Sequence, residues 1–249
     1  MDFFAKSDIG IKREENQDSY GFTEKTGEYL LSVVCDGMGG MAGGKTAAKL
    51  AVKTFLSRFG FFYSERIEAS GEVKAFDIKR IFSNAVYSAN KAICDEAEKD
   101  ESLFGMGSTL TSAFIYGNRL YTSNVGDSRI YLIRGDEISQ LTKDNSFVQE
   151  LLDQGIIDEE DARNHPRRNL ITKALGASRE IEPEYTATDL EEGDLILLCT
   201  DGLTNAVTDG EIKEIANKTG TLEEKVNALI TYANERGGDD NVTAVLIKI

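Results

Sequence analysis

The run of short strand-like segments between residues 108 and 141 most constrains the fold. Segments 108–116, 119–125, 129–134 and 137–141 are separated by the turns Gly117-Asn118, Gly126-Asp127-Ser128 and Gly135-Asp136. Such short glycine-containing turns reverse the chain, but they cannot hold the helix that a crossover between parallel strands needs. We therefore predict antiparallel hairpins at all three turns and no βαβ units in this region.

The rest of the chain adds apolar strands and amphipathic helices. Apolar runs at 29–35, 195–199 and 242–249 predict further strands, and apolar residues at helical spacing predict helices over 44–59 and 76–98. Capping boxes occur at Thr208 with Glu211 and at Thr221 with Glu224, and the second should open a helix. No linker or repeat divides the sequence. We expect one α+β domain over 1–249, with a sheet core covered by helices.

Composition excludes several classes of protein. The 249 residues include 28 basic and 43 acidic ones, for a net charge of −15, which argues against nucleic acid or an anionic membrane as a partner. A single histidine excludes a zinc site built on several imidazoles. The three cysteines lie in apolar or helical runs, as buried free thiols of a reducing cytosol do. With no signal-peptide pattern and no apolar run of about 18 residues, we expect a cytoplasmic protein.

Acidic residues stand at the ends of the most apolar strands. Asp36 and Asp201 each follow one of these strands, and Asp240 precedes a third. For any one of them, a plain turn is an alternative explanation, because Asp-Gly is common in turns. If the three strands are neighbours in one sheet, however, the carboxylates converge, and such a cluster requires cations. Two further acids are candidates for the same cluster: Asp127 lies in the turn Gly126-Asp127-Ser128, and Asp18 follows Asn16-Gln17.

Oxygen ligands favour hard cations such as Mg²⁺ or Mn²⁺. Four negative charges, on Asp18, Asp36, Asp201 and Asp240, would balance two divalent ions. A water between two such ions loses a proton near neutral pH and can attack phosphorus in line. The pattern therefore indicates metal-dependent hydrolysis of a phosphate ester.

A second motif favours another chemistry. The segment from Gly39 to Gly44-Lys45-Thr46 fits the phosphate-loop pattern of ATPases. That loop should begin where the strand ends, but Asp36-Gly37-Met38 intervenes, and the surrounding strands do not have a parallel arrangement. A phosphate-loop ATPase stays an alternative, which a test of Lys45 would settle.

Six short motifs together resemble one known family. They are Arg13-x-x-Asn16-Gln17-Asp18, Val34-Cys35-Asp36-Gly37-Met38-Gly39-Gly40, Gly107-Ser108-Thr109, Val125-Gly126-Asp127-Ser128-Arg129, Thr200-Asp201-Gly202-Leu203 and Asp240-Asn241-Val242-Thr243. Their order is that of the metal-dependent type 2C protein phosphatases, and the chain resembles a bacterial member from about residue 8 to residue 249. The resemblance implies a four-layer αββα sandwich of two antiparallel sheets, with two Mn²⁺ or Mg²⁺ ions at one edge.

The resemblance also implies a metal-ligand set. Asp36 resembles the carboxylate that bridges both ions, and the Gly37 carbonyl completes one of them. Asp201 and Asp240 match ligands of the other ion. Asp18 resembles an outer acid that holds metal-bound water.

Two further residues follow from the resemblance. Asp127, with Asp201, resembles the pair that binds a weaker third ion, and Arg13 matches an arginine that binds phosphate. Met38 departs from the eukaryotic pattern, which has a histidine there as proposed general acid. A thioether cannot donate a proton, so the general acid is left unidentified.

The charged stretch 144–183 contains both prolines and the histidine. A solvated surface loop is one interpretation. The other is a flap beside the metal edge, where His165, Arg167 and Arg168 would contact a substrate. His165 resembles a flap histidine of bacterial members.

The resulting functional expectation is a phosphoserine/phosphothreonine protein phosphatase. Its partners would be phosphorylated proteins and, by resemblance to bacterial members, a Ser/Thr kinase; we expect a monomer. A catalytically weak member of the same fold that binds phosphoproteins is the second alternative.

Overall fold

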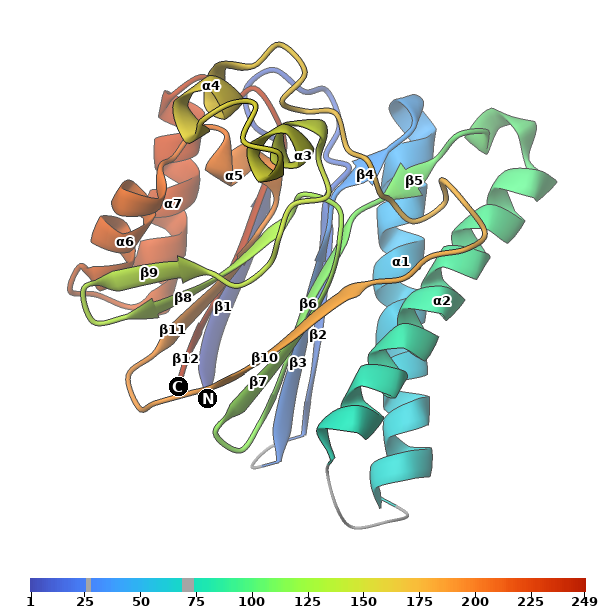
Figure 1. Cartoon of the computed structure of the whole chain (residues 1–249), viewed down its shortest axis with the longest axis horizontal. Coiled ribbons are helices and arrows are strands. Elements are labelled where there is room, and N and C mark those ends of the chain that lie inside the picture. Colours follow the sequence, from blue (N-terminus) through green and yellow to red (C-terminus); the bar gives the residue numbers. More distant parts are fainter. Residues whose placement is uncertain (26–27, 69–73) are drawn as a thin grey trace.

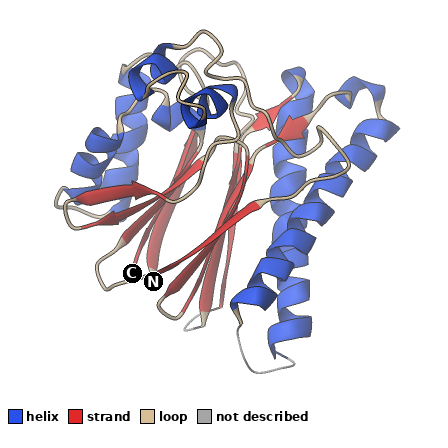
Figure 2. Ribbon diagram, in the orientation of Figure 1, coloured by secondary structure: helices blue, strands red, loops and turns tan. Residues whose placement is uncertain are grey.

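In the computed structural model, which describes residues 1–25, 28–68 and 74–249, two antiparallel sheets lie face to face between two layers of helices (Figure 1, Figure 2). In order, the first sheet contains β1 (Asp2–Asp8), β12 (Val242–Lys248), β11 (Leu195–Cys199), β8 (Arg129–Arg134) and β9 (Glu137–Gln140). The second contains β10 (Glu184–Asp189), β7 (Arg119–Val125), β6 (Leu110–Tyr116), β3 (Tyr29–Cys35) and β2 (Ser19–Lys25). The predicted αββα sandwich is confirmed.

Two long helices cover the outer face of the second sheet, and three cover that of the first (Figure 1). The long ones are α1 (Gly40–Tyr63), continued by a π-helical turn (Ser64–Glu68), and α2 (Ala75–Lys99), followed by a 3-10 turn (Glu101–Leu103). The others are α5 (Asp201–Thr204), α6 (Asp209–Asn217) and α7 (Leu222–Glu235). Both long helices were predicted, but α1 extends the prediction of 44–59 by four residues at each end.

Three apolar clusters form the core, one for each interface between layers. Phe55, Phe59 and Phe82 of the α1–α2 pair pack on the second sheet, and Leu229 and Ile230 of α7 pack on the first. Between the sheets lies a third cluster, which includes Leu30, Val34, Ile115, Ile130, Ile196, Leu198, Val245 and Ile247. β3, β11 and β12 contribute side chains to two clusters each. This burial on both faces explains why these strands read as continuous apolar runs.

The helix-start signals were correct. Thr208 accepts a hydrogen bond from the Glu211 N–H while Glu211 accepts one from the Thr208 N–H, and Thr221 and Glu224 repeat the arrangement at α7. The three cysteines are buried free thiols, also as predicted. Among the described residues, no helix is long and apolar enough to cross a membrane.

One of the three predicted hairpins is wrong. Strands β6 and β7 pair across 117–118, and β8 and β9 pair across 135–136, as expected. The turn 126–128, by contrast, joins β7 of the second sheet to β8 of the first. A short glycine turn can change sheets as well as reverse within one, and nothing in its residues distinguishes the two outcomes. The change of sheet puts Asp127 at the edge between the sheets.

Several strands were not predicted or have different bounds. β1, β2 and β10 were missed, because their residues are mostly half-exposed and mixed in polarity. The predicted strand 108–116 is split into β5 (Gly107–Ser108), which pairs with β4 (Gly37–Met38), and β6.

Segment 144–183 lies over the end of the sandwich at which α5 begins, and its later part runs past β4 and β5 (Figure 1). It contains α3 (Phe147–Asp153) and α4 (Glu159–Asn164), which the sequence analysis did not predict. An isolated bridge between Ser146 and Ile171 and the hydrogen bond from the Phe147 N–H to the Leu170 carbonyl, 2.8 Å, close its neck. Residues 147–170 therefore form a closed excursion, which we call the flap.

Candidate metal centre

Asp36 occupies the link between β3 and β4. Its N–H donates to Thr109 Oγ1 at 2.8 Å, and the Thr109 N–H donates to the Asp36 carbonyl at 2.8 Å. The next residue, Gly37, lies against the first turns of α1, where a Cβ would be only 2.0 Å from the Gly44 carbonyl oxygen. The backbone at Asp36-Gly37 is thus fixed by a strand pair on one side and a helix on the other.

Asp201 and Asp240 come from the first sheet. Asp201 begins α5 directly after β11, and Asp240 precedes β12, the hydrogen-bonded neighbour of β11. The condition stated for convergence, that all three strands are neighbours in one sheet, is not met, because β3 belongs to the second sheet. The convergence holds nonetheless: all three residues line one cleft of about 680 Å³, because the two sheets end at the same edge.

Asp18 and Asp127 extend the acidic cluster. Asp127 lines the same cleft from the crossover between sheets and is buried. Asp18 directly precedes β2 and is also buried, where its Oδ2 accepts hydrogen bonds from Thr200 Oγ1 and Thr243 Oγ1. Five carboxylates from five separate segments therefore meet at one edge.

The carboxylates lack the partners that burial demands. Asp18 Oδ1, Asp127 Oδ1 and Asp201 Oδ1 are buried without a hydrogen-bond partner among the described residues. Burial raises the pKa of Asp18 to about 7, with repulsion from Asp201 and Asp240 adding to it. Burial and repulsion from Asp240 raise the pKa of Asp201 to about 6.

The same causes act on the other two acids. Burial, with repulsion from Asp18 and Asp201, raises the pKa of Asp36 well above its ordinary range. Burial, with repulsion from Asp201, does the same for the pKa of Asp127. Orphaned oxygens and mutual repulsion are relieved by cations, and oxygen-only donors suit Mg²⁺ or Mn²⁺. The residues present fit such ions.

The cluster is not a complete coordination shell by itself. In the described residues, no three Asp, Glu, His or Cys side chains are already positioned to hold an ion. Arg13 Nη2 lies 2.6 Å from Asp240 Oδ2 and pairs with it. Small divalent ions also keep several waters, so a site for them needs few protein ligands.

Arg13 reaches the cleft because two loops are joined. The N–H groups of Ile11 and Lys12 donate to the Gly238 carbonyl at 2.8 and 3.1 Å. Asn241 Nδ2 donates to the carbonyls of Ile9 and Glu15. The loop from β1 to β2 is thereby held against the loop that precedes β12.

The phosphate-loop pattern does not form a phosphate loop. Gly40 to Lys45 are already helical as the start of α1, and Lys45 Nζ pairs with Glu15 Oε1 at 2.6 Å. Gly44 instead permits the close approach of α1 to Gly37, because a Cβ at Gly44 would lie 2.7 Å from the Gly37 carbonyl oxygen.

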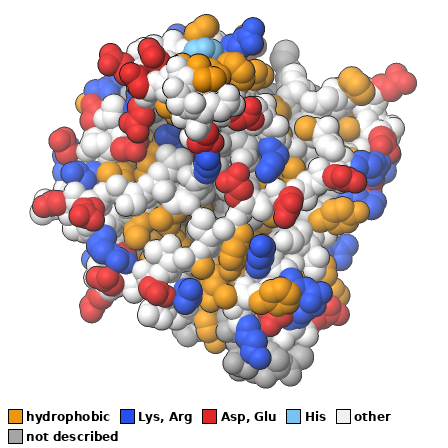
Figure 3. All heavy atoms as spheres, in the orientation of Figure 1, with side chains coloured by type: hydrophobic (Ala, Val, Ile, Leu, Met, Phe, Trp, Pro, Cys, Tyr) orange, Lys and Arg blue, Asp and Glu red, His pale blue; other side chains and the backbone are white. Residues whose placement is uncertain are grey.

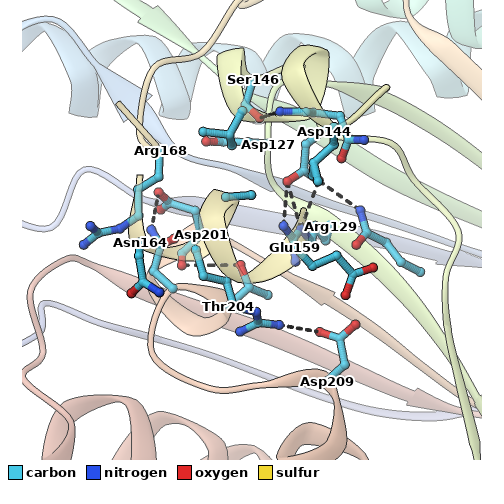
Figure 4. Close-up of a pocket in the computed structure, with 17 residues that line it drawn as sticks. Asp127, Arg129, Asp144, Ser146, Glu159, Asn164, Arg168, Asp201, Thr204 and Asp209 are labelled. Atoms are coloured by element: carbon cyan, nitrogen blue, oxygen red, sulfur yellow. Dashed lines mark hydrogen bonds and ion pairs between the residues drawn. The ribbon is translucent and has the colours of Figure 1, made fainter. Parts of the chain in front are cut away.

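The flap brings only one of its three predicted residues to a cavity beside the acids. Arg168 reaches a space of about 310 Å³ that Asp127 and Asp201 also line (Figure 4). Arg167 instead lies over the Phe147 ring, at 5.6 Å from its centroid, and the His165 ring lies 5.7 Å from the same ring. The Arg167 N–H donates to His165 Nδ1 at 3.1 Å. Within the described chain, these two residues line neither space.

Sequence reasoning missed several residues that support the site. Arg129 donates to both carboxylate oxygens of Asp144 at the base of the segment that carries the flap (Figure 4). Thr200 and Thr243 contact Asp18. Arg129, Thr200 and Thr243 all stand inside motifs that carry the family resemblance, which is the signal that could have found them. Elsewhere, acidic and basic side chains are interspersed over the face that Figure 3 shows.

Comparison with known proteins assigns the class of enzyme. The family model described as protein phosphatase 2C matches residues 11–246. The serine/threonine phosphatase stp of Listeria innocua is 37% identical over 243 residues, which cover 98% of this chain and 94% of the relative. The chain therefore belongs to the protein phosphatase 2C family. It is, accordingly, a hydrolase of the protein serine/threonine phosphatase class.

Solved structures agree with this assignment. The Mycobacterium tuberculosis phosphatase PstP/Ppp superposes with a TM-score of 0.86 at 37% identity, covering 100% of this chain and 98% of that one. The catalytic domain of a phosphatase PstP, solved in complex with two manganese ions, has a TM-score of 0.82 at 36% identity and covers 98% and 96%.

Proposed function

We propose that this enzyme hydrolyses phosphoserine and phosphothreonine in proteins by direct attack of water at a centre of two divalent ions, Mn²⁺ or Mg²⁺. The observation that carries the proposal is the set of buried carboxylate oxygens that have no partner among the described residues: those of Asp127 and Asp201 at the cleft, and that of Asp18. The manganese complex of a similar phosphatase supports the choice of ion.

Asp36, with the Gly37 carbonyl, would hold one ion and share the other with Asp201 and Asp240. Asp18 would order water in the outer shell, and Asp127 with Asp201 would hold a weaker third ion. When bound, the ions supply an activated water and neutralise the charge of the phosphoryl group. The chain's own part is to hold these oxygens at the edge where both sheets end.

Arg13 would bind the phosphate. Its guanidinium is half-exposed at the cleft, where it pairs with Asp240, and its planar fork suits two phosphate oxygens. A cation at this position also offsets the repulsion that a net charge of −15 imposes on an anionic substrate. Met38 also lines the cleft, and its thioether cannot protonate the leaving oxygen.

The flap would contact residues around the phosphorylated side chain. Arg168 is the predicted flap cation that reaches the acids, since it shares a cavity with Asp127 and Asp201. His165 and Arg167 would contribute from the outer side of the flap, where both pack on Phe147.

The proposal extends to the oligomeric state, the compartment and the partners of the enzyme. The enzyme would act as a monomer in the cytoplasm, on phosphorylated proteins that include a Ser/Thr kinase. The three free thiols are consistent with a reducing compartment.

A metal-series assay tests the function. Protein stripped with a chelator should be inactive on a small aryl phosphate and on a phosphothreonine peptide, and Mn²⁺ or Mg²⁺ should restore both activities. Binding of the phosphopeptide without turnover in any metal would instead indicate a phosphoprotein-binding member of the fold. Metal-dependent ATP hydrolysis that is lost in Lys45→Ala would indicate an ATPase.

A further inference from the structure

Two buried threonine hydroxyls meet at one oxygen of Asp18. Thr200 Oγ1 lies 2.8 Å and Thr243 Oγ1 2.6 Å from Asp18 Oδ2. Both threonines are fully buried at the end of the first sheet, Thr243 within β12 and Thr200 just after β11. Asp18 leads into β2 of the second sheet. The contact therefore joins the two sheets at the edge that carries the acids.

The surrounding hydrogen bonds fix the direction in which both hydroxyls donate. The Thr243 N–H donates to Thr200 Oγ1 at 2.9 Å, which leaves the Thr200 hydrogen for Asp18. Thr243 has one hydroxyl hydrogen, so its 2.7 Å contact with Ser7 Oγ makes Ser7 the donor once that hydrogen goes to Asp18. Asn16 Nδ2 in turn donates to Ser7 Oγ at 2.8 Å. The hydrogen bonds therefore run from Asn16 through Ser7 and Thr243 to Asp18 Oδ2, and Thr200 donates to the same oxygen.

The two oxygens of Asp18 consequently differ. Oδ2 receives two hydroxyl hydrogen bonds, whereas Oδ1 is buried with no partner among the described residues. Two donors, one in β12 and one just after β11, restrict rotation of the carboxylate about its last bond. Oδ2 is thus held by the two threonines, whereas Oδ1 has no partner among the described residues and can accept one.

We infer that Thr200 and Thr243 are positioning residues for the metal centre, which hold Asp18 by Oδ2 so that Oδ1 is presented to the ions and their water. The inference rests on the proposed function, because it assumes that Asp18 serves a metal centre. Neither threonine touches substrate or the reacting atoms. Partners that orient a metal-site carboxylate typically change metal affinity or activity by about 10–100-fold when they are removed.

Valine variants separate this role from packing, because valine has nearly the shape of threonine and lacks the hydroxyl. Thr200→Val and Thr243→Val should each weaken Mn²⁺ binding about tenfold or more, measured by titration calorimetry on the whole chain. The kcat on a phosphopeptide should fall with little change in KM. Thr243→Ser, which keeps the hydroxyl, should bind Mn²⁺ within about threefold of the parent, since the hydrogen bond to Asp18 is retained.

A matched control lies in the second sheet. Thr122 is a buried strand threonine whose hydroxyl bonds to Thr186 Oγ1 at 2.6 Å, away from the acids of the cluster. Thr122→Val should therefore lower the melting temperature slightly and leave Mn²⁺ affinity unchanged.

The outcomes separate the inference from the proposed function. Valine variants that melt lower but bind Mn²⁺ like the parent would overturn the inference, and so would equal loss of Mn²⁺ affinity in Thr243→Ser. If neither valine variant folds, the hydroxyls serve the fold alone and the inference is also wrong. A parent protein that binds no Mn²⁺ would refute the proposed function itself.

Discussion

Arg13 Nη2 lies 2.6 Å from Asp240 Oδ2, so a cation that we propose for phosphate is paired with a carboxylate that we propose for metal. Both side chains are partly exposed. An ion pair between exposed side chains stabilises a protein by only about 0–1 kcal/mol. It can therefore open at little cost when both residues find stronger partners.

Arg13→Ala should raise KM for an aryl phosphate about tenfold with little change in kcat. The phosphate carries its charge in the ground state and in the transition state, so the removed hydrogen bonds, about 1.5–3 kcal/mol, affect binding in both. Steady-state kinetics at saturating Mn²⁺ would measure this. Lys12→Ala is the comparison, since Lys12 also lines the cleft but pairs with exposed Asp239, and its effect on KM should be smaller. A loss confined to kcat would contradict the role of Arg13.

Asp36→Asn should be the most damaging single change in the cluster. The substitution keeps the shape and removes the charge from the residue that we propose to share both ions, so Mn²⁺ affinity and kcat should fall together, by at least about 100-fold. Asp240→Asn, which changes a ligand of only one proposed ion, should lower Mn²⁺ affinity and kcat less. Full activity of Asp36→Asn at low micromolar Mn²⁺ would refute the two-ion assignment.

Gly37→Ala should destabilise the protein and reduce metal binding. A Cβ at Gly37 would lie 2.0 Å from the Gly44 carbonyl oxygen, and backbone cannot move aside as a flexible side chain can. We expect a loss of about 2 kcal/mol or more in the free energy of unfolding. Gly60→Ala is the control in α1, because its Cβ would meet no atom within 4 Å. Gly60→Ala should stabilise the helix by roughly 0.5–1 kcal/mol. In denaturant melts, the free energy of unfolding should therefore rise for Gly60→Ala and fall for Gly37→Ala.

Metal-free protein should lose stability as pH rises from about 5 to 8. Unfolding returns Asp18 and Asp201 from pKa values of about 7 and 6 to an ordinary value near 3.9, so the folded state binds more protons across this range. The contribution of these two acids to the free energy of unfolding is complete below about pH 4, and it is lost as the pH rises through 6 and 7. Thermal melts in a chelator should fall by several degrees, and Mn²⁺ should reduce the difference. A melting temperature that rises over this range would contradict the burial of these acids.

Arg168→Ala should lower kcat/KM for phosphopeptides several-fold and spare a small aryl phosphate. Arg168 shares a cavity with Asp127 and Asp201, and the interactions with substrate that the variant removes would be remote from phosphorus. Arg167→Ala is the comparison within the flap and should have a smaller effect, because its guanidinium lies over Phe147 instead of in that cavity. Equal losses on both substrates would place Arg168 at the catalytic centre, and no loss on either would make the flap a solvated surface loop.

The strands buried on both faces and the capped helices could be predicted, because their residues carry strong local signals. β3, β11 and the start of α7 are examples. β1, β2 and β10 could not, since their pattern is mixed and their pairing is decided by distant strands. The turn at Asp127 shows the same limit: its residues specify a change of direction, not which sheet follows.

The acids of the site were selected correctly as residues that meet, but for a partly wrong reason. Their convergence was argued on the condition that the three strands are neighbours in one sheet, whereas Asp36 and Asp201 come from different sheets. The pairing of Arg13 with Asp240 and of Thr243 with Asp18 depends on packed loops and strand ends. Such pairs link residues more than 220 positions apart in the sequence, and no local pattern encodes them.

The position of β12 between β1 and β11 also bears on how the protein is made. β12 pairs with the first strand, from Asp2 opposite Lys248 to Asp8 opposite Val242, and with β11 on its other side. On a ribosome, β1 has no strand partner in its sheet until β12 has been synthesised. The site, which needs Asp240 just ahead of β12, is assembled at the same late moment. A nascent chain should therefore have no phosphatase activity until β12 has left the exit tunnel.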